Sequence, residues 1–215
     1  MTDVLAALGS CYTSVVHDVL RAMGLRNFTL PPRLRPLDPS GVLAGPAFTV
    51  EGRTDQTADA HQTLLACTGL LSQARPGHIW VSQPHDRTVA HMGELSAETL
   101  KNKGVRGCVA DGFIRDVNFL LAIGFQAWCR GFTPRDIVGT WLPVATDRPI
   151  RIGDVVIAPG DFMVGDRDGL IRIPRDRVEE VIDKAEAAMA TESLVRKAIL
   201  AGVDPQEAYL KYGKF

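Results

Sequence analysis

Apolar and amphipathic segments alternate regularly in the middle of the chain, and this pattern predicts a layered α/β domain. Short apolar runs over residues 78–82, 107–110 and 126–130 are typical of buried strands. Between them, residues 94–103 and 116–123 have the spacing of amphipathic helices, and each segment is followed by a glycine. This β-α-β-α-β order favours some parallel pairing of the strands.

The segments before this region predict both helix and strand. Residues 15–23 place apolar side chains on one face of a helix, for which Ser14 is the expected N-cap. A strand is predicted over 46–51 and a helix over 58–71. The stretch 27–41 contains four prolines, so we expect an irregular surface segment there.

The pattern changes after residue 133. Short strands separated by turn sequences are predicted over 150–157, 162–164 and 170–173. A long helix follows over about 176–201, with Asp176 as the expected N-cap and Glu179 three residues later. Residues 203–215 are expected to form a tail. Neither a repeat nor a low-complexity linker divides the chain, so residues 1–215 are interpreted as one domain.

Composition narrows the possible functions. Of the 215 residues, 46% are hydrophobic and 23% are charged, as in a globular domain with a sizeable core. The net charge of −1 gives no electrostatic case for binding nucleic acid or a membrane surface. No apolar run approaches the ~20 residues that span a bilayer. The four cysteines are widely spaced, without a CxxC pair. We therefore expect a soluble, reduced, cytoplasmic protein.

Arg115 and Asp116 are the first candidates for chemistry, because they lie between a predicted buried strand and the helix after it. Ligands of open α/β sheets collect at such strand ends, and a helix start favours an anion. Arginine offers a planar, charged fork that matches a carboxylate, and aspartate is a hard ligand for Mg²⁺ or Mn²⁺. The alternative is structural: Asp116 caps its helix and Arg115 pairs with it at the surface.

Glu94 opens the preceding predicted helix and provides a second candidate. Two consecutive helix starts at one sheet edge can face each other. One would offer the backbone amides of Leu95 and Ser96, and the other would offer Arg115. Glu94 would then place a second carboxylate near a cation. Alternatively, Glu94 only interacts favourably with the dipole of its own helix.

The spacing of these residues resembles a known family. Glu94 follows a glycine, twenty residues separate it from Arg115, and Asp116 comes next. In this feature the chain resembles the family that contains the 4-hydroxy-4-methyl-2-oxoglutarate/4-carboxy-4-hydroxy-2-oxoadipate aldolases and RraA, the regulator of ribonuclease E activity A. The resemblance extends to SVVHDVLRAMG near the N-terminus, GPAFTV from Gly45, and APGDFMVGDRDGLIRIP from Ala158.

The resemblance carries an expectation for the fold and the assembly. It implies a layered α-β-β-α sandwich with a central mixed sheet or barrel-like core, plus the long C-terminal helix. It also implies a homo-oligomer, either a trimer or a hexamer. The helix over about 176–201 and the tail 203–215 are expected to pack on a neighbouring subunit.

The resemblance also implies roles for the candidate residues. Asp116 would bind a divalent cation, Mg²⁺ or Mn²⁺, and Glu94 would hold water on that metal. The groups expected to bind the pyruvate portion of a substrate are Gly93, Leu95, Ser96 and Arg115. One position departs from the aldolase pattern, because Phe119 occupies a place that is often acidic.

The activity implied by the resemblance is cleavage of 4-hydroxy-2-oxo acids to pyruvate and a second oxo product. Decarboxylation of oxaloacetate is expected beside it. The alternative is a non-catalytic regulator of the RraA type, which binds a ribonuclease or another partner protein. Asp116 favours the enzyme, because regulators of this type without that acid lose the metal ligand.

Glu192 is the expected contribution of a neighbouring subunit. In the family, a glutamate from the C-terminal region of the adjacent subunit completes the site by holding water on the metal. Glu192 shares a helix face with Ala185 and Ile199, and a carboxylate on a burying face is costly unless it is paired. The alternative is an ion pair with Arg196, one helical turn further on.

Overall fold

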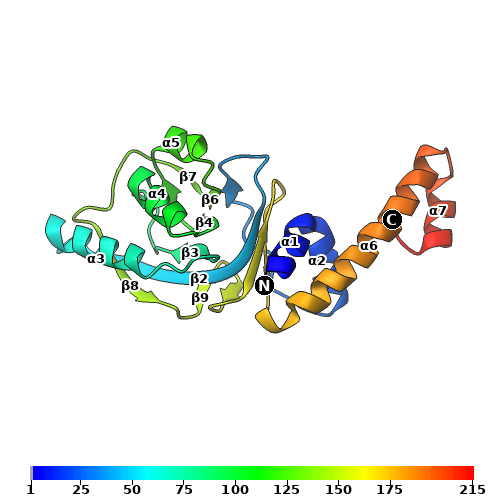
Figure 1. The fold of residues 1–215 in the computed structure, drawn as a ribbon, viewed down its shortest axis with the longest axis horizontal. Coiled ribbons are helices and arrows are strands. Elements are labelled where there is room, and N and C mark those ends of the chain that lie inside the picture. Colours follow the sequence, from blue (N-terminus) through cyan, green and yellow to red (C-terminus); the bar gives the residue numbers. More distant parts are fainter. Residues whose placement is uncertain (1) are drawn as a thin grey trace.

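A curled mixed sheet is the centre of the fold in the computed structural model, which describes residues 2–215 and the side chains from Val4 onward (Figure 1). Neighbouring strands follow the order β1-β6-β4-β3-β2-β11-β12, and β8 pairs with part of β2. The bounds are Arg35–Pro36 (β1), Leu43–Thr54 (β2), Ile79–Gln83 (β3), Gly107–Ala110 (β4), Ala127–Cys129 (β6), Trp141–Thr146 (β8), Phe162–Gly165 (β11) and Leu170–Ile173 (β12).

Strands β2, β3, β4 and β6 are parallel, as the alternation of segments predicts, and the other pairs of this sheet are antiparallel. The length of β2 lets it pair with β11 near its start and with β8 near its end. The β2–β8 register shifts between Glu51 and Gly52, and such a bulge increases local twist. A Cβ at Gly52 would lie 1.8 Å from the Trp141 ring. This glycine therefore lets the ring pack on the bend.

Helices cover one face of this sheet. They are α3 (Ala60–Ser72), α4 (Glu94–Asn102) and α5 (Val117–Ala122) (Figure 1). Trp80, Cys108 and Ala110 point to that side and pack with Leu100 and Leu120. The capping box of Asp59 and Gln62 fixes the start of α3.

The opposite face is closed by a hairpin and short loops. Strands β9 (Ile150–Ile152) and β10 (Val155–Ile157) form the hairpin. Its apolar residues pack against Ile79, Val81 and Val109, which alternate in sequence with the residues of the helical side. The sheet and the hairpin enclose a barrel-like core, so the predicted layered α/β fold with a mixed sheet is confirmed.

A third apolar cluster joins the termini to the outer sheet strands. It contains residues of α1 (Thr2–Ser10), α2 (Thr13–Ala22) and α6 (Val178–Leu200), together with β11 and β12. From there α6 extends away from the sheet, with α7 (Pro205–Tyr212) beside its far end (Figure 1). Within residues 2–215 no helix is both long and apolar enough to cross a membrane.

Several local predictions are wrong. Helix α2 begins at Thr13, so Ser14 lies inside it and its hydroxyl donates to Asp168 instead of capping. Asp176 lies in a 3₁₀ turn before α6 and caps nothing. The segment 27–41 is mostly irregular, but Leu30 and Leu34 are buried because they pack against the β9–β10 hairpin.

The predicted tail 203–215 contains helix α7. The Asp204 side chain accepts hydrogen bonds from the backbone amides of Gln206 and Glu207, and Pro205 occupies the first turn. These signals start the helix. Packing of this region on a neighbouring subunit stays a prediction.

Candidate active site

The loops after β3 and β4 bring two helix starts together. Both strands end at the same sheet edge, since they are parallel neighbours. The loop before α4 then pairs with the loop before α5: the His91 amide donates to Phe113 O at 2.8 Å, and the Arg115 amide donates to Met92 O at 2.9 Å. This ladder places Gly93 and Glu94 beside Arg115 and Asp116.

Asp116 has an unusual backbone conformation. Its φ of 56° and ψ of 38° are left-handed, a region that non-glycine residues rarely adopt. It occupies the N-cap position of α5, but its side chain does not cap that helix. Instead, Oδ2 accepts a hydrogen bond from the Glu94 amide at 3.0 Å. Of the structural alternative, the cap by Asp116 on its own helix is therefore wrong, whereas the pair with Arg115 is present.

Arg115 lies between two carboxylates. Its Nε is 3.4 Å from Asp116 Oδ2, and Nη1 is 3.6 Å from Asp136 Oδ2. The guanidinium is only partly buried, so it remains accessible to a ligand. Asp136 comes from the loop before β8, and no motif in the sequence indicates it. Only the fold brings this loop to the cleft.

These groups line a cleft of about 470 Å³. It contains every site residue predicted for this part of the chain: Gly93, Glu94, Leu95, Ser96, Arg115 and Asp116. Within residues 2–215, neither the Leu95 amide nor the Ser96 amide has a hydrogen-bond acceptor, and the Glu94 carboxylate has no polar partner. Leu71, Ile137 and Val138 make one wall apolar. The cleft thus offers donors for an anion beside an apolar surface.

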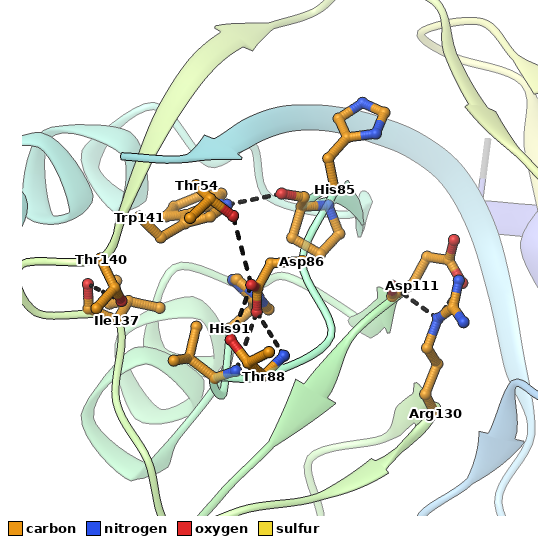
Figure 2. A network of polar contacts seen from close by, with 12 residues as sticks. Thr54, His85, Asp86, Thr88, His91, Asp111, Arg130, Ile137, Thr140 and Trp141 are labelled. Carbon is orange, nitrogen blue, oxygen red and sulfur yellow. Dashed lines mark hydrogen bonds and ion pairs between the residues drawn. The ribbon is translucent and has the colours of Figure 1, made fainter. Parts of the chain in front are cut away.

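His91 forms the inner wall of the cleft and is almost completely buried, with a side-chain exposure of 2%. Its Nε2 lies 3.3 Å from Asp86 Oδ1, and its ring contacts Trp141 edge-on (Figure 2). Burial lowers the pKa of His91 to about 4, although the Asp86 carboxylate acts in the opposite direction. The ring is therefore neutral at pH 7.

The carboxylate oxygens in the cleft suit a hard cation that retains water. No three His, Cys, Asp or Glu side chains converge as a metal cage among residues 2–215, which is unlike a structural zinc site. Mg²⁺ commonly uses one or two carboxylates and keeps several waters. Asp116 and Glu94 fit that pattern in the cleft.

Glu192 lies outside this cleft. It is on α6, where it accepts a hydrogen bond from Tyr12 Oη and lies 3.0 Å from Lys214 Nζ. The expected alternative, an ion pair with Arg196, is absent from the described residues. A contribution of Glu192 to the site of a neighbouring subunit stays a prediction.

Comparisons with known proteins agree with these features. The protein-family model RraA-like, described as Aldolase/RraA, matches residues 13–172 of this chain. A protein of Halalkalibacterium halodurans named "Putative 4-hydroxy-4-methyl-2-oxoglutarate aldolase" is 33% identical over 210 residues, which are 97% of this chain and 94% of that protein.

Solved structures share the fold. One is RraAS2 of Streptomyces coelicolor, described as an unusual member of the RNase ES inhibitor RraA protein family. Its TM-score is 0.81 at 27% identity, over 90% of this chain and 96% of that chain. An uncharacterized protein from Pseudomonas syringae has a TM-score of 0.85 at 24% identity, over 97% of both chains. The second similarity supports the fold alone.

Proposed function

Because the chain belongs to the Aldolase/RraA family, we propose that it is a divalent-metal-dependent aldolase. Its substrates are 4-hydroxy-2-oxo acids such as 4-hydroxy-4-methyl-2-oxoglutarate, which it cleaves to pyruvate and a second oxo compound. The observation that carries the proposal is the hydrogen bond from the Glu94 amide to Asp116 in a cleft that also contains Arg115. A carboxylate, a guanidinium and free helix amides thereby meet in one place.

Arg115 and the amides of Leu95 and Ser96 bind the carboxylate and 2-oxo group of the substrate. A guanidinium fork matches a carboxylate, and unpaired amides at a helix start favour negative charge. The same donors stabilise the charge that develops on the 2-oxo oxygen as the bond breaks. The apolar wall with Ile137 and Val138 accommodates carbon atoms of the substrate.

Asp116 would hold Mg²⁺ or Mn²⁺, which supplies Lewis-acid polarisation of the 2-oxo group. A water held by Glu94 takes the proton from the C4 hydroxyl. The C4 oxygen becomes a carbonyl, the C3–C4 bond breaks, and its electron pair passes to the pyruvate enolate. Protonation at C3 then gives pyruvate. Loss of CO₂ from oxaloacetate gives the same enolate, so we expect decarboxylase activity as well.

We further propose a ring-shaped homo-oligomer, a trimer or a pair of trimers, in which Glu192 of a neighbouring subunit completes the site. The position of Glu192 on the protruding helix α6 supports this assignment. The exposed apolar residues of the C-terminal region, among them Leu200, Leu210 and Phe215, offer surface for such packing.

The test is pyruvate release from 4-hydroxy-2-oxo acids, together with oxaloacetate decarboxylation and exchange of the pyruvate methyl protons with solvent. We expect all three with Mg²⁺ or Mn²⁺, and a loss of activity with chelator or with Asp116→Ala. A regulator of the RraA type would behave differently, because partner binding would survive both treatments. Absence of decarboxylation and proton exchange in the presence of Mg²⁺ would refute the aldolase.

A further inference from the structure

A second cavity, which we name the arginine pocket, lies at the same sheet edge as the cleft, where β3, β4 and β6 end, and is also lined by residues of the β9–β10 hairpin. It has a volume of about 420 Å³ and shares no lining residue with the cleft. Four arginines line it: Arg33, Arg87, Arg130 and Arg151. They come from the segment before β1, the loop after β3, the residue after β6, and β9. The fold therefore gathers charges from four distant parts of the sequence.

Asp111 organises the base of the arginine pocket. Asp111 and Arg130 lie beside each other (Figure 2). The Asp111 side chain is 2% exposed and accepts hydrogen bonds from Arg130 Nε at 2.8 Å and from Gln83 Nε2 at 2.9 Å. Arg33 Nε lies 3.3 Å from Asp111 Oδ1, and Arg33 Nη2 lies 3.3 Å from Asp111 Oδ2. Burial by itself raises the pKa of Asp111, but the bonds from Arg130, Gln83 and Arg33 outweigh it and lower the pKa. The carboxylate stays charged and fixes two guanidinium groups.

The pocket retains an excess of positive charge. Asp111 and Asp86 are the two carboxylates among its lining residues. Asp86 is engaged by the amides of Thr88 and Val89 and by the buried His91. Within residues 2–215, neither Arg87 nor Arg151 has an ion-pair partner. Four guanidinium groups and two carboxylates leave the pocket with more positive than negative charge, and such an excess in a concave site favours an added anion.

We propose that the arginine pocket binds a small oxyanion with at least two negative charges, of the phosphate or polycarboxylate class. Arginine forks match the oxygen geometry of both groups. A volume of about 420 Å³ suits a small molecule. The four arginines line one cavity and do not form an extended stripe along the surface. The Arg130 side chain is 13% exposed, and its terminal nitrogens have no other acceptor among residues 2–215. It presents a preorganised donor at the base of the hollow.

The experiment is calorimetric titration of the 215-residue chain, at low ionic strength and without divalent metal, with inorganic phosphate and separately with citrate. We expect saturable binding of at least one anion. Arg87→Gln and Arg151→Gln should each weaken it by about tenfold or more, as expected for loss of a charge-assisted hydrogen bond. Among residues 2–215 neither side chain has an ion pair, so we expect both variants to keep the fold. The stronger ligand of the two identifies the anion class.

Two control variants make the outcome decisive. Arg148→Gln removes an exposed arginine outside the pocket and should leave binding unchanged. Arg115→Gln removes the guanidinium of the cleft and should also leave it unchanged, which separates this site from the proposed aldolase site. The proposal is overturned if neither anion saturates, if Arg87→Gln and Arg151→Gln bind normally, or if Arg115→Gln abolishes binding. Binding of an RNA oligonucleotide without phosphate or citrate binding would also overturn it.

Discussion

The Asp116 carboxylate accepts a hydrogen bond from the Glu94 backbone amide at 3.0 Å, across 22 positions of sequence. This bond ties the start of α5 to the start of α4. Asp116 makes this bond from a left-handed backbone conformation, which costs roughly 1–2 kcal/mol for a residue with a side chain. The surrounding loop ladder holds this conformation, and one carboxylate oxygen is directed at the neighbouring helix start instead of at its own helix.

Asp116→Asn should separate charge from shape. Asparagine tolerates the left-handed conformation, and its amide oxygen accepts the same hydrogen bond, so the melting temperature should change little. The variant lacks the negative charge needed to hold Mg²⁺ or Mn²⁺. We expect oxaloacetate decarboxylation to fall on the order of 100-fold or more, measured as pyruvate release at saturating metal. Retention of most of the activity would show that the charge is dispensable.

Gly93→Ala should damage both stability and activity. A Cβ at this position would lie 2.7 Å from Asp116 Oδ2 and 3.1 Å from Arg115 Cγ, so one of these side chains must move. Overpacking of this kind costs about 1–3 kcal/mol. The measurement is the free energy of unfolding in urea, together with pyruvate release.

Gly69→Ala is the matched control. Gly69 lies inside α3 and has nothing within 4 Å of the added Cβ. Alanine should therefore stabilise that helix by about 0.5–1 kcal/mol. Equal effects of the two substitutions would contradict the close packing between Gly93 and Asp116.

The burial of His91 predicts a specific dependence of stability on pH. The pKa of His91 falls from its ordinary 6.5 to about 4 in the folded protein, chiefly because of burial. Between these values the unfolded chain binds the proton more readily, so the free energy of unfolding should fall as pH decreases through this window. This loss of stability amounts to roughly 3 kcal/mol at most, and most of it has occurred by about pH 4.

Urea unfolding of the protein and of His91→Gln between pH 7 and pH 4 checks this prediction. The variant should lack this part of the pH dependence. The titration of Asp86 in the folded protein lies below this pH range. Burial alone would raise the pKa of Asp86, but hydrogen bonds outweigh that effect and lower the pKa to about 2. A parallel loss of stability in both proteins would place the effect elsewhere.

Sequence pattern predicts the fold best where contacts are local. The strands β3, β4 and β6 and the helices α4 and α5 are apparent from short-range periodicity, and β4 has the predicted bounds. The facing helix starts are also predictable. Parallel neighbours end at one sheet edge, so Glu94 and Asp116 must meet there.

The features that sequence reasoning misses depend on long-range packing. Asp136 approaches Arg115 because β8 returns antiparallel to β2. The arginine pocket requires four segments from distant parts of the sequence to meet, and each arginine alone resembles a solvated surface residue. No feature of the sequence indicates the left-handed backbone of Asp116 or the hydrogen bond that its side chain accepts from the Glu94 amide.

A mixing experiment tests whether Glu192 acts in a neighbouring subunit. In this structure Glu192 lies on the protruding α6, near Tyr12 and Lys214, whereas Arg115 lies in the cleft. We expect Glu192→Gln and Arg115→Gln each to lose most activity. Joint refolding of the two variants should regain up to about a quarter of the wild-type rate, since about one interface in four then combines an intact Arg115 with an intact Glu192. No gain in a mixture shown to be co-assembled would place both residues in the same subunit's site, or Glu192 in none.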